Sequence, residues 1–309
     1  MKIRPRPWQL ALGLILLCTL IAVVALYWKR TFSLSTKELV ALFPKENGAV
    51  FYVDLGLIRK SGVLDRVSTA AVAEEEDYRR FVEQTGFDYK TDLNELAAFY
   101  AKDEYLFALT GNFDWKRLIA YAKQQGGRCQ NGLCRAPTSK RGRWFSFYAL
   151  NEHVMAAAIS NDEAAAARVR RRDPDPSLTV PSSPVWMSVP AFMLQNNEAL
   201  PSGARQFAKL LSANAERLLM SVGLSSDRFE LQVDVTCKTA EQAAVLRTDL
   251  QNLTTLLQSF IAREKQKPNP GDLSGVLTAG TFHREDRHVI ARWPMDMAFL
   301  ENLTAMGSP

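Results

Sequence analysis

Apolar positions are distributed unevenly along this chain, and the longest apolar run lies at its start. Residues 8–28 contain no charged residue, and only Gln9, Cys18 and Thr19 interrupt their apolar character. A helix needs ~20 such residues to cross the ~30 Å hydrocarbon core of a bilayer. Aromatic residues lie at both ends of the run and basic residues flank it, as is typical of a membrane-spanning segment. We therefore predict a membrane anchor over residues 1–32, with the transmembrane helix at about 8–28.

A cleaved signal peptide is the main alternative interpretation of this segment. Its apolar core would be ~7–15 residues long and would end at a small-x-small cleavage site. The observed run is longer, Ala22 and Ala25 have the wrong spacing, and Leu17 precedes Cys18, where a lipoprotein signal needs a small residue. We therefore favour an uncleaved anchor, with the lipid bilayer as the partner of residues 8–28.

The rest of the chain alternates between short strand patterns and amphipathic helical patterns. Period-two alternation of β-branched and aromatic residues indicates strands, and apolar positions three and four residues apart indicate helices. In the first half these patterns predict strands at 49–54, 95–101, 104–110, 144–150 and 153–159, and helices at 35–43, 55–71, 74–86, 115–125 and 162–172. In the second half they predict strands at 185–189, 216–224, 228–237, 277–283 and 288–293, and helices at 204–212, 239–265 and 295–303.

Strands joined by short turns, with helices between groups of strands, indicate an α+β fold with mainly antiparallel sheets and flanking helices. Residues 173–184 contain four prolines and three serines, a composition that favours an extended linker. This linker divides the body into two predicted α+β domains, residues 33–172 and 185–309. Each has a strand, a helix, antiparallel strands and a closing helix, which suggests two related halves, although no residue-level repeat is visible.

Two of the four cysteines, Cys129 and Cys134, flank an Asn131-Gly132 pair with one residue between on each side. Asn-Gly is a strong hairpin signal, because both central residues of a type I′ turn need a positive φ. Cys129 then faces Cys134 with Cα atoms ~4.5 Å apart, at the short end of the range that a disulfide can bridge. A disulfide here indicates an oxidising compartment, and the alternatives are a reduced pair in the cytosol or half of a metal site.

The topology follows from the basic residues near the anchor together with this hairpin. The numbers of basic residues on the two sides of the apolar run are nearly equal, but those before it are packed into the first seven residues. This density favours a cytoplasmic N-terminus, and the predicted disulfide places the body on the other, oxidising side. We therefore expect a single-pass protein of the cell membrane with an extracytoplasmic body.

Composition and charge argue against a nucleic-acid partner. The chain is 47% hydrophobic and 23% charged, with a formal net charge of +5, which is ordinary for a globular protein. The densest basic run, Arg168–Arg172, falls at the end of the predicted helix 162–172, where cations suit the helix dipole. No nucleic-acid motif or interleaved aromatic residue accompanies this run, so we expect no nucleic-acid binding.

The sequence contains no motif for catalysis or cofactor binding. It has no glycine-rich phosphate loop, dinucleotide fingerprint, zinc-protease motif or nucleophile elbow, so we expect no cofactor and no metal. His283 and His288 would face each other if Glu285 and Asp286 formed a two-residue turn, and such a pair could bind a metal or sense pH. Two ligands do not make a metal site, so we favour a structural role for this pair.

Three stretches of the first half resemble a known group of proteins. They are Leu39 to Asp54, in which a Leu-Phe-Pro turn leads into a Val-Phe-Tyr-Val-Asp strand, then Gly86-Phe87-Asp88, and Leu109-Thr110-Gly111-Asn112-Phe113. These stretches are similar to uncharacterised single-span bacterial proteins in which a membrane helix precedes an α+β body. The resemblance implies an anchor and an α+β fold for the first half, and it carries no established activity.

Two functions of different classes are consistent with these patterns. The first is a non-enzymatic binding module of the cell envelope, which contacts another envelope protein or an apolar ligand between sheet and helix. The second is a membrane-tethered, hydrolase-like enzyme whose residues converge only in three dimensions. A cleft that gathers carboxylates or the two histidines would favour the enzyme, and an apolar groove would favour the binding module. The missing motifs lead us to favour binding.

Overall fold

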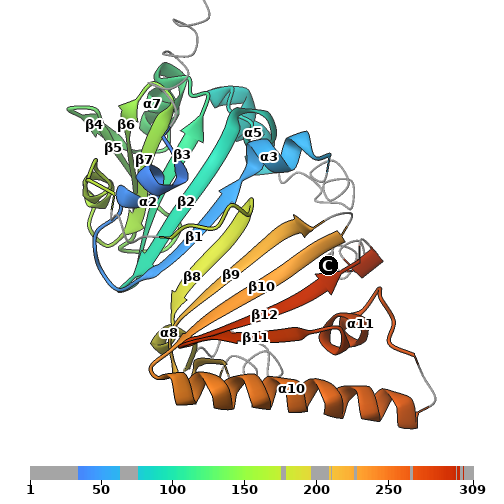
Figure 1. Cartoon of the computed structure of the whole chain (residues 1–309). Coiled ribbons are helices and arrows are strands. Elements are labelled where there is room, and N and C mark those ends of the chain that lie inside the picture. The colour runs from blue at the N-terminus through green and yellow to red at the C-terminus, as the bar shows by residue number, and fades with distance from the viewer. Residues whose placement is uncertain are drawn as a thin grey trace, which may run out of the picture.

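Twelve antiparallel strands form one continuous sheet at the centre of the molecule (Figure 1). The computed structural model describes residues 34–62, 76–174, 179–195, 209, 211–225, 228–264, 267–296, 298, 299 and 302. The strands are β1 (Ala49–Asp54), β2 (Leu93–Ala101), β3 (Glu104–Gly111), β4 (Arg128–Gln130), β5 (Leu133–Pro137), β6 (Trp144–Asn151), β7 (Val154–Ser160), β8 (Val185–Pro190), β9 (Ala215–Ser225), β10 (Arg228–Cys237), β11 (Thr281–Glu285) and β12 (His288–Met295). Their order in the sheet is β11-β12-β10-β9-β8-β1-β2-β3-β7-β6-β5-β4. The predicted α+β class with mainly antiparallel pairing is therefore confirmed.

Helices lie against this sheet and connect its strands. They are α2 (Thr36–Ala41), α3 (Leu55–Lys60), α5 (Glu76–Thr85), α6 (Tyr89–Asp92), α7 (Trp115–Gln124), the 3₁₀ helix η1 (Ala165–Arg168), α8 (Phe192–Gln195), α10 (Ala240–Arg263) and α11 (Leu273–Thr278). Side-chain caps fix several of their starts, because the first backbone N–H groups of a helix have no partner within it. Ser35 and Glu38 form a complete capping box on α2, and the hydroxyl of Thr239 accepts from the backbone N of Gln242 on α10 (3.2 Å).

The two halves of the sheet share one topology. The order β1-β2-β3-β7-β6 in the first half is repeated as β8-β9-β10-β12-β11 in the second, with α7 after β3 and α10 after β10. The halves join where β1 pairs with β8 in antiparallel register, and Tyr52 on β1 stacks on Trp186 on β8 with ring centroids 5.5 Å apart. One sheet thus runs through both halves, while their division into domains at residues 173–184 stays a prediction. Residues 175–178 of that linker lie outside the described residues.

The alternating strand residues bury apolar side chains on both faces of the first half and mainly on one face of the second. On one face of the first half, α2 and η1 cover Tyr52, Phe99 and Leu106. Helix α7 covers the opposite face of that half, and α10 covers the corresponding face of the second half, along which it runs in Figure 1. The other face of β10 carries Glu230, Gln232, Asp234 and Thr236, as period-two alternation predicts for a half-exposed sheet.

The predicted helix 162–172 is wrong, because only the 3₁₀ helix η1 forms there. Val169 follows η1, is fully buried, and its carbonyl accepts a hydrogen bond from the hydroxyl of Tyr148. The backbone N of Arg170 then donates to the carbonyl of Leu42 at the end of α2 (3.1 Å). These tertiary contacts draw the chain into an extended path, so the helix propensity of the alanine-rich segment is overridden.

Several other predictions fall partly or wholly outside the described residues. The predicted transmembrane helix at 8–28 does so entirely, as do most of 204–212 and residues 297, 300, 301 and 303 of the predicted helix 295–303. Of the predicted helix 55–71, α3 ends at Lys60, and residues 63–75 are not described. None of the helices within the described ranges is both long and apolar enough to cross a membrane.

Candidate functional site

Helix α7 forms one wall of a cavity on the sheet of the first half. Asp114 caps this helix, with Oδ1 accepting a hydrogen bond from the backbone N of Arg117 (3.0 Å). Apolar residues four positions apart turn Leu118 and Ala122 toward the sheet, where both are buried. The helix therefore presents an apolar inner surface, while Lys123 on its outer side is exposed.

Helix α5 and the segments around it add an aromatic second wall. The ring of Phe81 on α5 packs edge-on against Tyr121 of α7, with centroids 5.2 Å apart. Phe87 stacks on Phe113 at 5.3 Å, which joins the end of α5 to the loop before α7. Gly86 has a φ of 70°, the left-handed conformation that glycine adopts readily after a helix, and it lets the chain turn back after α5.

Between these walls and the sheet lies a cavity of about 430 Å³. Small-molecule sites are typically ~300–1,000 Å³ and mostly apolar, with a few polar groups that orient the ligand. This cavity fits that description, since its polar side-chain atoms belong to Tyr121, Gln125 and Thr138 alone. The lining residues are Phe81, Phe87, Leu109, Phe113, Leu118, Tyr121, Ala122, Gln125, Ala136, Pro137, Thr138, Phe145, Phe147 and Met155.

The disulfide between Cys129 and Cys134 stabilises the part of the wall that β5 provides. Its hairpin forms as predicted: Asn131 and Gly132 have φ values of 51° and 80°, and the two cysteine Cα atoms are 4.0 Å apart. Cys134 is buried in the cluster of side chains under α7, and β5 continues from it to Ala136 and Pro137 at the cavity. The cross-link therefore closes the short edge hairpin, and the buried Cys134 packs this hairpin under the helix.

In the second half, side chains fill the space between α10 and the sheet that corresponds to the cavity under α7. Leu250 on the inner side of α10 is 1% exposed, and Trp293 on β12 is 3% exposed. Phe282 on β11 packs edge-on against Trp293 with ring centroids 5.7 Å apart, so large residues occupy this space. The same arrangement of helix and sheet therefore encloses a packed core in one half and the aromatic cavity in the other.

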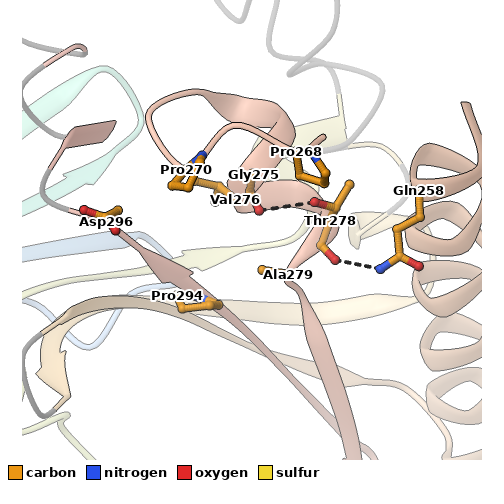
Figure 2. A pocket seen from close by; sticks show the side chains of 9 residues that line it. All are labelled: Gln258, Pro268, Pro270, Gly275, Val276, Thr278, Ala279, Pro294 and Asp296. Atoms are coloured by element: carbon orange, nitrogen blue, oxygen red, sulfur yellow. Dashed lines mark hydrogen bonds between the residues drawn. The ribbon is translucent and has the colours of Figure 1, made fainter. Parts of the chain in front are cut away.

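A second hollow of about 380 Å³ lies between α10, α11 and the end of β12 (Figure 2). Its polar groups already bond to one another: Gln258 Nε2 donates to the carbonyl of Thr278 (2.8 Å), and Thr278 Oγ1 donates to the carbonyl of Gly275 (3.3 Å). The first of these bonds ties α11 to α10, and the second lies within α11. The arrangement is that of a structural junction, so the aromatic cavity is the stronger candidate site.

The two histidines do not face each other as predicted, because the turn between their strands is shifted by one residue. Glu285 pairs with His288 and His283 pairs with Ile290, so the turn consists of residues 286 and 287. The backbone N of Cys237 donates to the carbonyl of Arg287 (2.8 Å), which holds that residue beside β10 and sets the register.

Each histidine instead has a carboxylate partner of its own. His288 Nδ1 lies 2.9 Å from Asp234 Oδ1, and His283 Nε2 lies 3.4 Å from Glu285 Oε1. Both pairs are on the surface, on the polar side of the sheet. Within the described ranges, no group of three or more His, Cys, Asp or Glu residues is placed to hold a metal ion.

Sequence reasoning missed the cavity and its aromatic lining. The local signals were present, because Phe145 and Phe147 alternate along β6 and Leu118 and Tyr121 are three positions apart on α7. Such periodicity predicts which side chains face inward. It does not predict whether those side chains fill the space between helix and sheet, which depends on contacts between elements distant in sequence.

The solved structures that resemble this chain are distant ones. No model of a known protein family matches the chain, and no curated protein does. Crystal forms I, III and IV of TP0453 align with TM-scores of 0.47, 0.46 and 0.45, at 9–10% sequence identity. The alignments cover 86–89% of this chain and 95–99% of TP0453. We draw no conclusion about family or function from a similarity at this level.

Proposed function

We propose that the protein is a membrane-anchored, extracytoplasmic binding protein that holds a small apolar ligand in the aromatic cavity under α7. The cavity itself carries this proposal. Its volume, its six aromatic side chains and its few polar atoms are those of a small-molecule site. A concave site of this kind suits a small molecule better than another envelope protein, which would need a broad contact surface.

The anchor and the compartment rest on other observations. The uncharged run of residues 8–28 supports a single membrane span, and the hairpin disulfide supports an oxidising compartment for the body. The hydrolase alternative has less support, because none of the described residues that line the cavity is a carboxylate or a histidine. Binding is therefore the function that we propose.

Binding can be tested by titrating the full chain in lipid nanodiscs with N-phenyl-1-naphthylamine, a neutral dye that fluoresces in apolar sites. Ala122→Phe places a ring in the cavity and should weaken saturable dye binding at least tenfold. Ala120→Phe is the matched control, since Ala120 is exposed on the same helix, and it should bind within twofold of wild type. Equal binding by wild type and Ala122→Phe, with empty discs subtracted, would refute the proposal.

The compartment can be tested by peptide mass spectrometry of the native, membrane-bound protein, with free thiols blocked before lysis. A cross-linked peptide that contains Cys129 and Cys134 is expected for an extracytoplasmic body. Recovery of both cysteines in the blocked, reduced form would contradict the proposed topology.

A further inference from the structure

The charged residues of the segment around the cavity are all basic. Residues 115–151, which include α7, the β4–β5 hairpin and β6, contain eight Lys or Arg and no Asp or Glu. The whole chain has a net charge of +5, so the residues outside this segment sum to −3. The positive charge of the protein is therefore concentrated on α7, the β4–β5 hairpin and β6, which form part of the cavity.

The turn after β5 brings part of this charge to the cavity. Thr138 lines the cavity, and its backbone N and its hydroxyl both donate to the carbonyl of Arg143 (3.0 and 3.1 Å). The same hydroxyl lies 3.1 Å from the carbonyl of Lys140. These bonds fold residues 138–143 into a tight turn that carries Lys140, Arg141 and Arg143 beside the lining residue.

Two of these cations, Lys140 and Arg141, are available to a ligand. Lys140 and Arg141 are exposed, and the guanidinium of Arg143 lies 6.0 Å from the ring centroid of Tyr105. None of the three forms an ion pair with a carboxylate in the part of the chain that the structure describes. Long basic side chains also reach over apolar surface while their charged ends stay in water.

We propose that the ligand is an anionic amphiphile. Its aromatic or alkyl body occupies the cavity, and its carboxylate, sulfonate or phosphate group stays at the mouth, where the cations of the 138–143 turn attract it. This inference rests on the proposed binding function and adds the charge of the ligand to it. An apolar cavity with cations on the adjacent turn favours a molecule that has one apolar end and one anionic end.

Two dyes that share one skeleton separate the charge from the apolar contact. 8-Anilinonaphthalene-1-sulfonate carries a sulfonate, and N-phenyl-1-naphthylamine does not. With the full chain in nanodiscs, the double variant Lys140→Gln, Arg141→Gln should bind the anionic dye at least fivefold more weakly than wild type. Its binding of the neutral dye should weaken less than twofold. Raising NaCl from 50 to 300 mM should weaken only the anionic dye, because ~0.1 M salt screens exposed charges beyond ~10 Å.

A matched control removes the same charge from the opposite face of the sheet. Arg170 and Arg171 are exposed near α2, and Arg170→Gln, Arg171→Gln should leave both dyes within twofold of wild type. Equal loss of the anionic dye in both double variants would overturn the proposal, because the effect would then be one of net charge. Unchanged binding of the anionic dye in Lys140→Gln, Arg141→Gln would also overturn it.

The outcomes separate this inference from the proposed function, and competition identifies the source of the ligand. If Ala122→Phe weakens both dyes while the charge variants weaken neither, the cavity binds ligands without regard to charge. If Ala122→Phe weakens neither dye, the binding function itself fails. Displacement of the anionic dye by octanoate indicates a water-borne ligand, and displacement by palmitate supplied in the bilayer indicates a membrane-derived one. Displacement by neither would contradict an anionic amphiphile.

Discussion

Filling the cavity from α7 should stabilise the protein. Ala122 is 4% exposed and lines the cavity, so Ala122→Leu would add three carbons to existing free space without exposing them to water. Burial of each carbon contributes ~0.8 kcal/mol, or ~2.4 kcal/mol in all. Fixing the rotamer of a buried leucine costs ~0.5–1 kcal/mol. We therefore expect the free energy of unfolding to rise by ~1.5 kcal/mol for the ligand-free protein.

The same Ala→Leu substitution should lower the free energy of unfolding at a position where side chains already fill the space between helix and sheet. Ala243 is fully buried on the inner side of α10, where large side chains occupy the space, so Ala243→Leu should lower the free energy of unfolding by ~1–3 kcal/mol through overpacking. Pulse proteolysis of the full chain in nanodiscs over a series of urea concentrations measures both changes. If Ala122→Leu destabilises the protein as much as Ala243→Leu, the space under α7 is not free and the cavity cannot hold a ligand.

Two further predictions concern the disulfide and a buried hydroxyl. The double variant Cys129→Ala, Cys134→Ala should lower the free energy of unfolding by ~2 kcal/mol, which is the loop-closure entropy of a loop with sequence separation 5. A reductant should lower the free energy of unfolding of the wild type by the same amount and should leave that of the double variant unchanged. Tyr52→Phe removes the hydrogen bond from a buried hydroxyl to Glu95 Oε1 (2.7 Å) and should cost ~1.5–3 kcal/mol at pH 7 in urea unfolding. Burial raises the pKa of Tyr52 above its ordinary value, so wild-type stability is complete below pH ~10 and falls above it, as the unfolded chain alone loses the proton. The difference between wild type and Tyr52→Phe should therefore shrink above pH ~10, and a constant difference up to pH ~11 would contradict this explanation.

Elements with strong local signals could be predicted from the sequence. The cysteine hairpin is an example, because Asn131 and Gly132 favour the positive φ that a tight turn requires. The start of α7 is another, since Asp114 satisfies a backbone N–H group that lacks a partner inside the helix. In both cases the decisive interaction lies within a few residues of the chain.

Errors arose where distant segments decide the conformation. The alanine-rich segment before Pro174 has a helical sequence, but Val169 is buried against other elements and Arg170 bonds to the carbonyl of Leu42, 128 residues earlier. The β11–β12 turn shifted by one residue because Arg287 bonds to Cys237 on another strand. Neither contact leaves a pattern in the local sequence.

The cavity lies where the two halves of the sheet differ most. In the second half, α10 spans Ala240–Arg263, and the chain returns to the sheet through α11. In the first half, α7 spans only Trp115–Gln124, and the chain returns through the disulfide-linked β4–β5 hairpin. That hairpin contributes Ala136 and Pro137 to the lining and leads into the basic turn at 138–143. A short helix leaves part of the layer unfilled, and the hairpin that replaces α11 supplies both a wall and the charge. The binding site that we propose is therefore built from the elements that distinguish the first half from the second, which shares its topology.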